Sequence, residues 1–455
     1  MAFVLGSAPD ISPNLISVAD AMKFPGQRKS KHYFPVGRRD PLMQQVNPLF
    51  ERSTAYIVGI DQTLVDIEAK VDDDFLQRYG LSKGHSLLVS DDTAEAIYRE
   101  LLARQMIESQ FAGGTIANTL HNFSVLSDAP SVLLGVMSQQ IEVGSYAYRY
   151  LCNTSAKVDL NHLQPVPGPI GRCFTFVSAD GDRSFGINPG LMNRISPDYI
   201  PDDLIRGASA LVISAYFIRE APGDSLRAST MKAVNLAREA GVPVVLTLGT
   251  RFVIDADPQW WREFIAEYVT VLAMNEEEGE ALTGLSDPLL AADAALEWAD
   301  LVLCTAGASG LFMAGYTELS ARRETVLPLL PGAIPEFNRY EFSRPMLRRD
   351  CTEAQKVFAH IAPYMGGPER IKNTNGAGDG ALSAILHDMA ANSYHRQAVP
   401  NSAKHEFPCL TYSSFSQLCK YANRVSYEVL MQSSPRLSRG LPEREDSLEE
   451  VYWER

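Results

Sequence analysis

The chain has 455 residues, of which 45% are hydrophobic, so it can bury the core of one large α/β domain or of two modest ones. Its net charge of −14 argues against nucleic acid as a ligand, because such binding needs Lys and Arg that neutralise phosphates. No apolar run approaches the length of a membrane span, and the first residues lack the basic region of a signal peptide. The six cysteines and eight histidines show no metal-ligand spacing. We therefore expect a cytoplasmic protein with buried free thiols and no membrane contact.

The first 60 residues predict a peripheral extension followed by a strand. Residues 1–50 are rich in Pro, Gly and Ser and carry a basic cluster at 28–31. The run 53–60 then predicts a strand with Gly59 near its end, which leads into GIDQTLVDI. Taken alone, Asp66 in this segment is also compatible with a surface carboxylate on an edge strand.

A helix predicted over 94–107 precedes the sequence FAGGTIANT. Its glycines, Gly113 and Gly114, leave room for a ligand to approach the backbone closely, because they carry no Cβ. Asn118 follows on the first turn of the next helix, where its amide can both donate and accept hydrogen bonds. Two adjacent glycines before a helix are a weak signal by themselves.

The middle of the chain predicts a hairpin and then a parallel sheet. Two β-rich runs meet around Asp180-Gly181, which indicates a β-hairpin. Strands alternate with helices elsewhere, which is typical of right-handed crossovers in a largely parallel sheet. The predicted strands are 131–137, 210–215, 242–248, 270–274 and 301–305, and the predicted helices are 142–151, 226–239, 258–268 and 415–431.

Two further patterns lie where predicted strands lead into helices. Asn275 and Glu278 stand three apart at the end of a strand, and acidic residues there either serve a hydrated cation or favour the helix dipole. The segment NTNGAGDG, 373–380, opens an apolar helix and leaves unpaired backbone N–H groups that can bind an anion such as phosphate. Its carboxylate, Asp379, is suited to act as a base, although a plain helix N-cap is the alternative.

In this order, the three motifs at 113–118, 275–278 and 373–380 resemble those of the ribokinase-like (PfkB-type) sugar and nucleoside kinases, over about 54–435. The resemblance implies an α/β fold of three α/β/α layers, with a mostly parallel central sheet and a small β-sheet lid. It implies that Gly376, Ala377 and Gly378 form an anion hole and that Asp379 deprotonates the acceptor hydroxyl. We expect the helix N-terminus to keep Asp379 ionised at neutral pH. The family more often has Asp where this chain has Asn373, which concerns only outer cation contacts.

The resemblance also assigns the remaining site residues. Asp66 would grip two ribose hydroxyls, because a carboxylate can accept from both at once. Asn275 and Glu278 would position Mg²⁺, largely through water, and a monovalent cation such as K⁺ is left open. The other residues assigned to the acceptor are Asp61, Gln62, Gly113, Gly114 and Asn118, and those assigned to ATP are Thr305, Gly307, Gly310 and Asn423.

The predicted organisation is one kinase domain over 51–440 with a discontinuous lid. The lid would come from about 61–72, 107–112 and 168–190, with insertions at about 316–372 and 391–410 and a C-terminal tail at 441–455. We expect the acidic end of the chain, from SPRLSRG at 434 onward, to be peripheral.

Within the family, LVDI, FAGGTIANT and NTNGAGDG resemble nucleoside kinases. The runs SYAYRYLCN, GRCFTF, VVLTLGT and SPRLSRGLPERE extend the resemblance to kinases of inosine and guanosine. This implies phosphoryl transfer from ATP to the ribose 5′-OH of inosine or guanosine, giving IMP or GMP in purine salvage. The alternatives are a kinase of adenosine or of a free sugar, and a nucleoside-binding regulator without catalysis. The intact Asp379 argues against the regulator. A homodimer is compatible with the sequence, which does not decide the oligomeric state.

Overall fold

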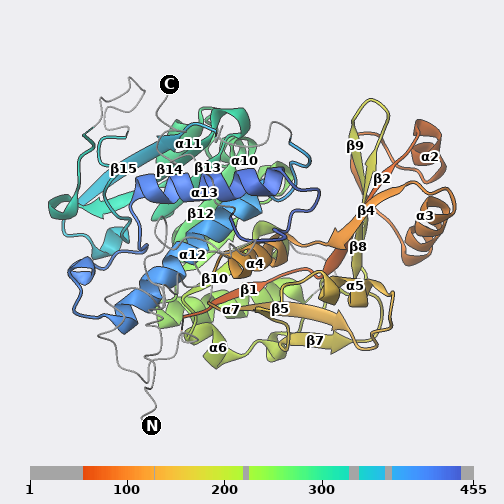
Figure 1. Ribbon diagram of the computed structural model, residues 1–455, viewed down its shortest axis with the longest axis horizontal. Coiled ribbons are helices and arrows are strands. Elements are labelled where there is room, and N and C mark those ends of the chain that lie inside the picture. The colour runs from red at the N-terminus through yellow and green to blue at the C-terminus, as the bar shows by residue number, and fades with distance from the viewer. Residues whose placement is uncertain (1–54, 128, 219–224, 327–337, 364–370, 442–455) are drawn as a thin grey trace, which may run out of the picture.

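The computed structural model describes residues 55–127, 129–218, 225–326, 338–363 and 371–441 (Figure 1). The predicted N-terminal extension and nearly all of the predicted tail at 441–455 lie outside the described residues.

A ten-stranded sheet forms the centre of the molecule. In this sheet, strands β1, β5, β6, β10, β11, β12 and β13 are parallel to one another, whereas β14 and β15 are antiparallel to their neighbours. The inner strands are buried on both faces, as the continuous apolar sequence of β10 requires. The spatial order is β15 (Ala354–Ile361), β14 (Leu311–Glu318), β13 (Leu301–Thr305), β12 (Val271–Asn275), β11 (Val244–Thr247), β10 (Ala210–Ser214), β1 (Ile57–Ile60), β5 (Ser131–Ser138) and β6 (Val158–Asp159), and β7 (Leu163–Val166) pairs with β5.

Two groups of helices pack on this sheet and complete three layers. The first group is α4 (Thr115–Leu126), α12 (Ala377–Ala398) and α13 (Phe415–Leu430), of which α12 and α13 cross in front of the sheet in Figure 1. The second group is α6 (Asp202–Arg206), α7 (Leu226–Ala240), α8 (Arg251–Asp255), α9 (Pro258–Tyr268), α10 (Glu276–Thr283) and α11 (Pro288–Ala295). Helix α12 is buried along most of its length because α4, α13 and the strands β10 and β12 all contact it. No helix among the described residues is long and apolar enough to span a membrane.

A second, five-stranded sheet projects to one side of this body (Figure 1). Its order is β3 (Ser86–Leu88), β9 (Arg183–Asn188), β8 (Gly171–Val177), β2 (Leu64–Lys70) and β4 (Ile107–Ala112), with α2 (Asp73–Arg78), α3 (Asp91–Ala103) and α5 (Tyr146–Cys152) nearby. Strands β8 and β9 pair antiparallel, so the predicted hairpin is confirmed. The predicted parallel sheet and the smaller second sheet are thus both present.

Some predicted boundaries are wrong for local reasons. The helix predicted to reach 107 ends at Ala103, because Gln105 adopts a left-handed φ of 55° and the chain turns into β4. The helix predicted from 142 begins only after Ser145, whose hydroxyl accepts from the N–H of Tyr148.

The two predicted insertions contain regular structure. Strand β15, at the edge of the central sheet, lies within 316–372. Helix α12 continues to Ala398 and so enters the stretch 391–410. Residues 327–337 and 364–370 of the first stretch lie outside the described residues.

Candidate active site

Helix α12 begins with a glycine-rich turn whose N-cap residue has no side chain to cap the helix. Gly376 is its N-cap, with a left-handed φ of 79°, and a Cβ there would lie 2.4 Å from Cβ of Pro435. Asp379 is the third helical residue, so the alternative of Asp379 as the N-cap is wrong. Within the described residues no side chain caps this terminus, and a Cβ on Gly378 would meet open space. The first N–H groups of α12 are therefore available to an anion.

Asp379 meets the other glycine motif through a hydrogen bond. Asn118 Nδ2 donates to Asp379 Oδ2 over 3.3 Å, although the two residues are 261 positions apart. Burial raises the pKa of Asp379 to about 7, against the lowering effect of the Asn118 bond. This differs from the expectation that the helix N-terminus keeps Asp379 ionised at neutral pH, because burial favours the neutral carboxyl group. A pKa near 7 suits a general base, which must both lose and accept a proton easily.

Asp66 approaches the same place from β2. Its Oδ2 would lie 2.3 Å from a Cβ on Gly113, so the carboxylate occupies the space that a larger residue would need. Burial raises the pKa of Asp66 to about 7, while the positive charge of Arg436 lowers it. Asp66 also raises the pKa of Asp379, which indicates that the two carboxylates act on each other electrostatically.

Asp61 has a different environment from Asp66. Its Oδ1 accepts from the N–H of Gln62 over 2.8 Å, and its Oδ2 accepts from the N–H of Ala117 over 2.6 Å. A Cβ on Gly114 would lie 2.3 Å from that same Oδ2. Asp61 thus fixes the start of α4 to the end of β1, which leaves Asp66 as the better placed carboxylate for a ligand. The side chain of Gln62 donates to Asn193 Oδ1 over 2.5 Å.

Asn275 and Glu278 form a capping box at the start of α10. Asn275 Oδ1 accepts from the N–H of Glu278 over 2.8 Å, and Glu278 Oε2 accepts from the N–H of Asn275 over 3.0 Å. Glu278 is only 4% exposed, and burial raises its pKa to about 7. Its charge in turn raises the pKa of Asp379. The pair therefore has a structural role, and Glu278 lies within electrostatic reach of Asp379.

Asn275 and Glu278 are suited to hold a magnesium ion that keeps most of its water ligands. The described residues hold no cluster of three His, Cys, Asp or Glu that could coordinate a metal directly. Mg²⁺ dehydrates reluctantly and is commonly held by one or two carboxylates, waters and substrate phosphates. Glu278 and the amide of Asn275 supply hard oxygen atoms of that kind at the end of β12.

The residues predicted to contact ATP lie at one end of the central sheet. Thr305 ends β13 and pairs directly with Asn275 of β12, and Gly307 begins the 3₁₀ turn that follows. Gly310 lies against the carbonyl of Ile361 at the end of β15. Asn423 of α13 donates to the carbonyl of Ala362 over 2.7 Å. Gly310 and Asn423 therefore border the same turn, and their contact with ATP remains a prediction.

Arg436 is a candidate site residue that the sequence analysis missed. The residues from 434 onward were predicted to be peripheral, yet Arg436 is 4% exposed and its Nε donates to Asn118 Oδ1 over 2.9 Å. The prediction is wrong for 434–437, which run along α4, because Asn122 pairs with the backbone on both sides of Arg436. The run SPRLSRGLPERE entered the sequence analysis only as part of the resemblance to nucleoside kinases, and a single arginine between Pro and Leu has no periodicity that could have indicated this contact.

Arg183 was also missed. It begins β9, and its Nη1 donates to Asn375 Oδ1 over 3.1 Å, which brings the small sheet into contact with the NTNGAGDG loop. Its position beside the Asp180-Gly181 turn was predicted, but the contact depends on how the two sheets are arranged.

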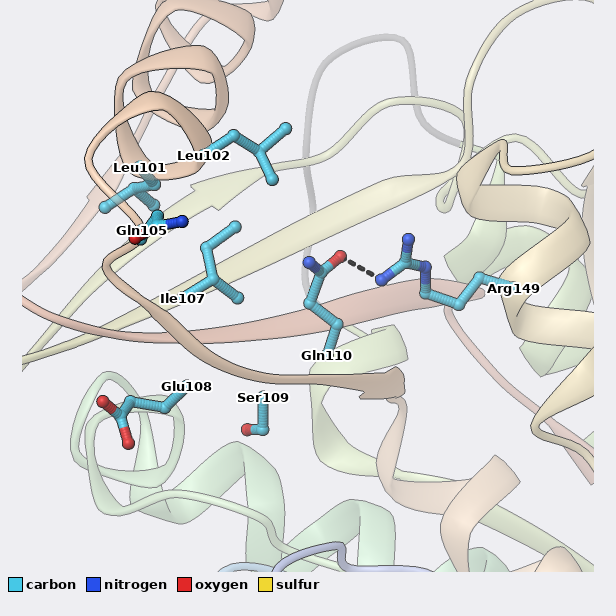
Figure 2. A pocket seen from close by; sticks show the side chains of 8 residues that line it. All are labelled: Leu101, Leu102, Gln105, Ile107, Glu108, Ser109, Gln110 and Arg149. Carbon is cyan, nitrogen blue, oxygen red and sulfur yellow. Dashed lines mark hydrogen bonds between the residues drawn. The ribbon is translucent and has the colours of Figure 1, made fainter.

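The pocket drawn in Figure 2 lies apart from these residues. It encloses about 470 Å³ between the end of α3, strand β4 and Arg149 of α5, and Gln110 bonds to Arg149 within it. None of the predicted site residues lines it.

Comparison with known proteins gives consistent relatives. Residues 84–326 match the model of the pfkB family carbohydrate kinases. The "Guanosine-inosine kinase" of Escherichia coli (strain K12) is 66% identical over 434 residues, which cover 95% of this chain and 100% of that protein. The "Adenosine kinase" of Saccharomyces cerevisiae is 28% identical over 239 residues, covering 50% of this chain and 66% of that protein.

The crystal structure of adenosine kinase from Sinorhizobium meliloti superposes with a TM-score of 0.60 at 19% identity, over 85% of this chain and 96% of that one. The predicted ribokinase-like fold is confirmed.

Proposed function

This chain belongs to the pfkB family of carbohydrate kinases, and we propose that it is a purine nucleoside kinase that transfers phosphoryl from ATP to the ribose 5′-OH of guanosine or inosine. It is a phosphotransferase with an alcohol group as acceptor. The predicted function agrees with the guanosine-inosine kinase relatives, which match the chain along nearly its whole length. Adenosine and free sugars remain the competing acceptors.

The observation that carries this proposal is the meeting of Asp379, Asn118 and Asp66 at the N-terminus of α12. A carboxyl group with a pKa of about 7 stands beside backbone N–H groups that can hold an anion. A hydroxyl that accepts a phosphoryl group needs both neighbours, one to take its proton and one to bind the transferring group.

In the reaction, Asp379 takes the proton of the 5′-OH while that oxygen attacks the γ-phosphorus in line with the leaving ADP oxygen. The backbone N–H groups of 376–378 bind the equatorial oxygens of the transferring group. Asp66 accepts hydrogen bonds from the ribose diol, and Asn118 orients the sugar beside the base. When bound near Asn275 and Glu278, Mg²⁺ supplies positive charge to the ATP phosphates.

The small sheet is proposed as the lid of this site. Its strand β2 carries Asp66, and its hairpin brings Arg183 to the loop that begins α12. Such a cover excludes water, which protects the phosphoryl group from hydrolysis and strengthens the electrostatic interactions beneath it.

The cofactor, compartment and assembly follow from the same proposal. ATP with Mg²⁺ is the phosphoryl donor, and dependence on K⁺ and a homodimer stay predictions. All six cysteines are free, which agrees with the reducing cytoplasm predicted as the compartment. The prediction that the thiols are buried holds for Cys304 and Cys419 and is wrong for Cys152, which is exposed.

The test is a panel of acceptors with labelled ATP. Inosine, guanosine, adenosine, ribose and fructose are compared at matched concentrations, and the product is identified as the 5′-phosphate. The proposal expects kcat/KM for guanosine and inosine to exceed that for adenosine and the sugars by about 100-fold or more. A preference for adenosine or a free sugar would replace the assigned substrate, and nucleoside binding without turnover would favour the regulator.

A further inference from the structure

The segment 433–437, after α13, touches both glycine motifs. Asn373 Nδ2 donates to the carbonyl of Ser433 over 3.0 Å, and Pro435 lies against Gly376. Asn122 of α4 donates to the carbonyl of Pro435 over 3.0 Å and accepts from the N–H of Leu437 over 2.7 Å. The segment therefore joins the start of α12 to the side of α4.

Arg436 is the side chain of this segment that enters the site. Besides Asn118, its guanidinium donates to the carbonyl of Gly113 over 3.0 Å, to the carbonyl of Asn153 over 3.2 Å and to Thr154 Oγ1 over 2.8 Å. It also lies over the ring of Tyr150, with 5.3 Å from Cζ to the ring centroid. A buried guanidinium with this many acceptors is held in one orientation.

This orientation determines how the amide of Asn118 points. A guanidinium has only donors, so the amide oxygen of Asn118 must face Arg436. The amide NH₂ then faces Asp379, which can only accept when it is ionised. Asn118 is 6% exposed, so a reversed amide would place its NH₂ against the guanidinium with little water to relieve the mismatch.

Arg436 also supplies the positive charge among several buried carboxyl groups. Asp61 lies after β1, Asp66 on β2, Asp379 on α12 and Glu278 on α10. The charge of Arg436 lowers the pKa of Asp61, Asp66 and Asp379, whereas Asp66 and Glu278 raise the pKa of Asp379. Its removal should therefore make Asp379 harder to ionise.

We propose that Arg436 is a positioning residue for phosphoryl transfer, which fixes the Asn118 amide with its NH₂ toward Asp379 and the acceptor hydroxyl. This role rests on the proposed kinase function. It ties the C-terminal segment, which lies outside the three motifs at 113–118, 275–278 and 373–380, to the geometry of the reacting groups.

A double-mutant cycle on kcat tests whether Arg436 acts through Asn118. The variants are R436M, N118A and the double variant, assayed with inosine and saturating ATP at a pH above the acid limb of all three, so that Asp379 is ionised in each. Each single change is expected to lower kcat by about 10- to 100-fold, because the acceptor is no longer aligned with the base. The double variant should be no worse than N118A by more than about 3-fold, since both changes remove the same alignment. A loss of kcat in the double variant that equals the product of the two single losses would overturn the proposal.

The pH profile of kcat/KM provides the readout that a purely structural role would not move. In R436M the acid limb should shift to higher pH, because the charge that favours ionised Asp379 is gone. In R436K the charge remains and the planar fork is lost, so kcat should fall while the acid limb stays near that of wild type. An unmoved limb in R436M would overturn the proposal, as would wild-type kcat in R436K.

The matched control is R439M, a change of an exposed arginine that lies three residues after Arg436 and just beyond the segment. Its kcat and pH profile should equal those of wild type. Should R436M fail to fold, R436K carries the cycle with N118A and is judged by the same criterion. Absence of turnover in wild type would refute the proposed function and this inference together, whereas an additive cycle beside an active wild type would refute only the role of Arg436.

Discussion

Gly113→Ala tests whether Asp66 binds the ribose hydroxyls, without changing any polar group. The new Cβ would lie 2.3 Å from Asp66 Oδ2 and 2.5 Å from Leu64 Cδ1, whereas ordinary contacts begin near 3.4 Å. The carboxylate must therefore retreat by about 1 Å, and a misplacement of that size in a site costs on the order of 100-fold. We expect kcat/KM for inosine to fall by about 5- to 150-fold, the range for losing a hydrogen bond to a buried charged group.

The assay compares inosine with 2′-deoxyinosine in wild type, Gly113→Ala and Asp66→Ala, at saturating ATP. Wild type should disfavour the deoxynucleoside by about 5- to 150-fold, because one hydroxyl partner of Asp66 is missing. Both variants should lose most of that discrimination and keep their KM for ATP. Full discrimination in Asp66→Ala, or equal handling of both nucleosides by wild type, would refute Asp66 as the diol ligand and make Asp61 the next candidate. Overpacking in Gly113→Ala typically costs about 1–3 kcal/mol of folding stability. A thermal melt of this variant therefore shows how much of its lost activity comes from destabilisation.

Two other predictions concern Asp379 and the carboxyl group of Glu278 near it. Glu278→Gln should raise the Mg²⁺ concentration needed for half-maximal rate, because it weakens the hydrogen bonds that orient the waters of the ion, and an unchanged requirement would leave Asn275 and Glu278 with the capping role alone. The rate with wild type should be fully present well above pH 7 and fall as the pH drops through about 7, because Asp379, with a raised pKa of about 7, must be ionised to accept a proton. A profile flat from pH 5.5 to 8.5 would contradict this assignment.

Elements with strong local signals were predicted well. Helix α9 (Pro258–Tyr268) and strand β13 (Leu301–Thr305) have the predicted bounds, because Asp257 and Pro258 mark the helix start and a continuous apolar run marks the strand. The order of the α/β alternation indicated the parallel sheet correctly. Edge strand β15 was missed because its polar and charged positions hide the alternation expected of a strand.

The candidate site was predictable only where glycines and carboxylates stand in recognised motifs. Asp379 and Asn118 were both identified, and the structure brings them within hydrogen-bond distance. The raised pKa of Asp379 was not predicted, because it comes from burial in the folded chain and from the charges of Asp66 and Glu278, which lie in other parts of the sequence. Arg436 was missed for the same reason, since its partners lie about 280 to 320 positions earlier in the sequence.

Asp379→Asn measures the central claim most directly. The change is nearly isosteric and preserves an acceptor for Asn118, but the amide cannot take the proton of the 5′-OH. The measurement is the single-turnover rate of ATP with bound inosine, together with the Kd of inosine by calorimetry. We expect the rate to fall by about 100-fold or more, while the Kd of inosine changes by less than about 3-fold. Phosphoryl transfer at the wild-type rate, or weakened binding with an unchanged rate in the bound complex, would show that Asp379 is not the base.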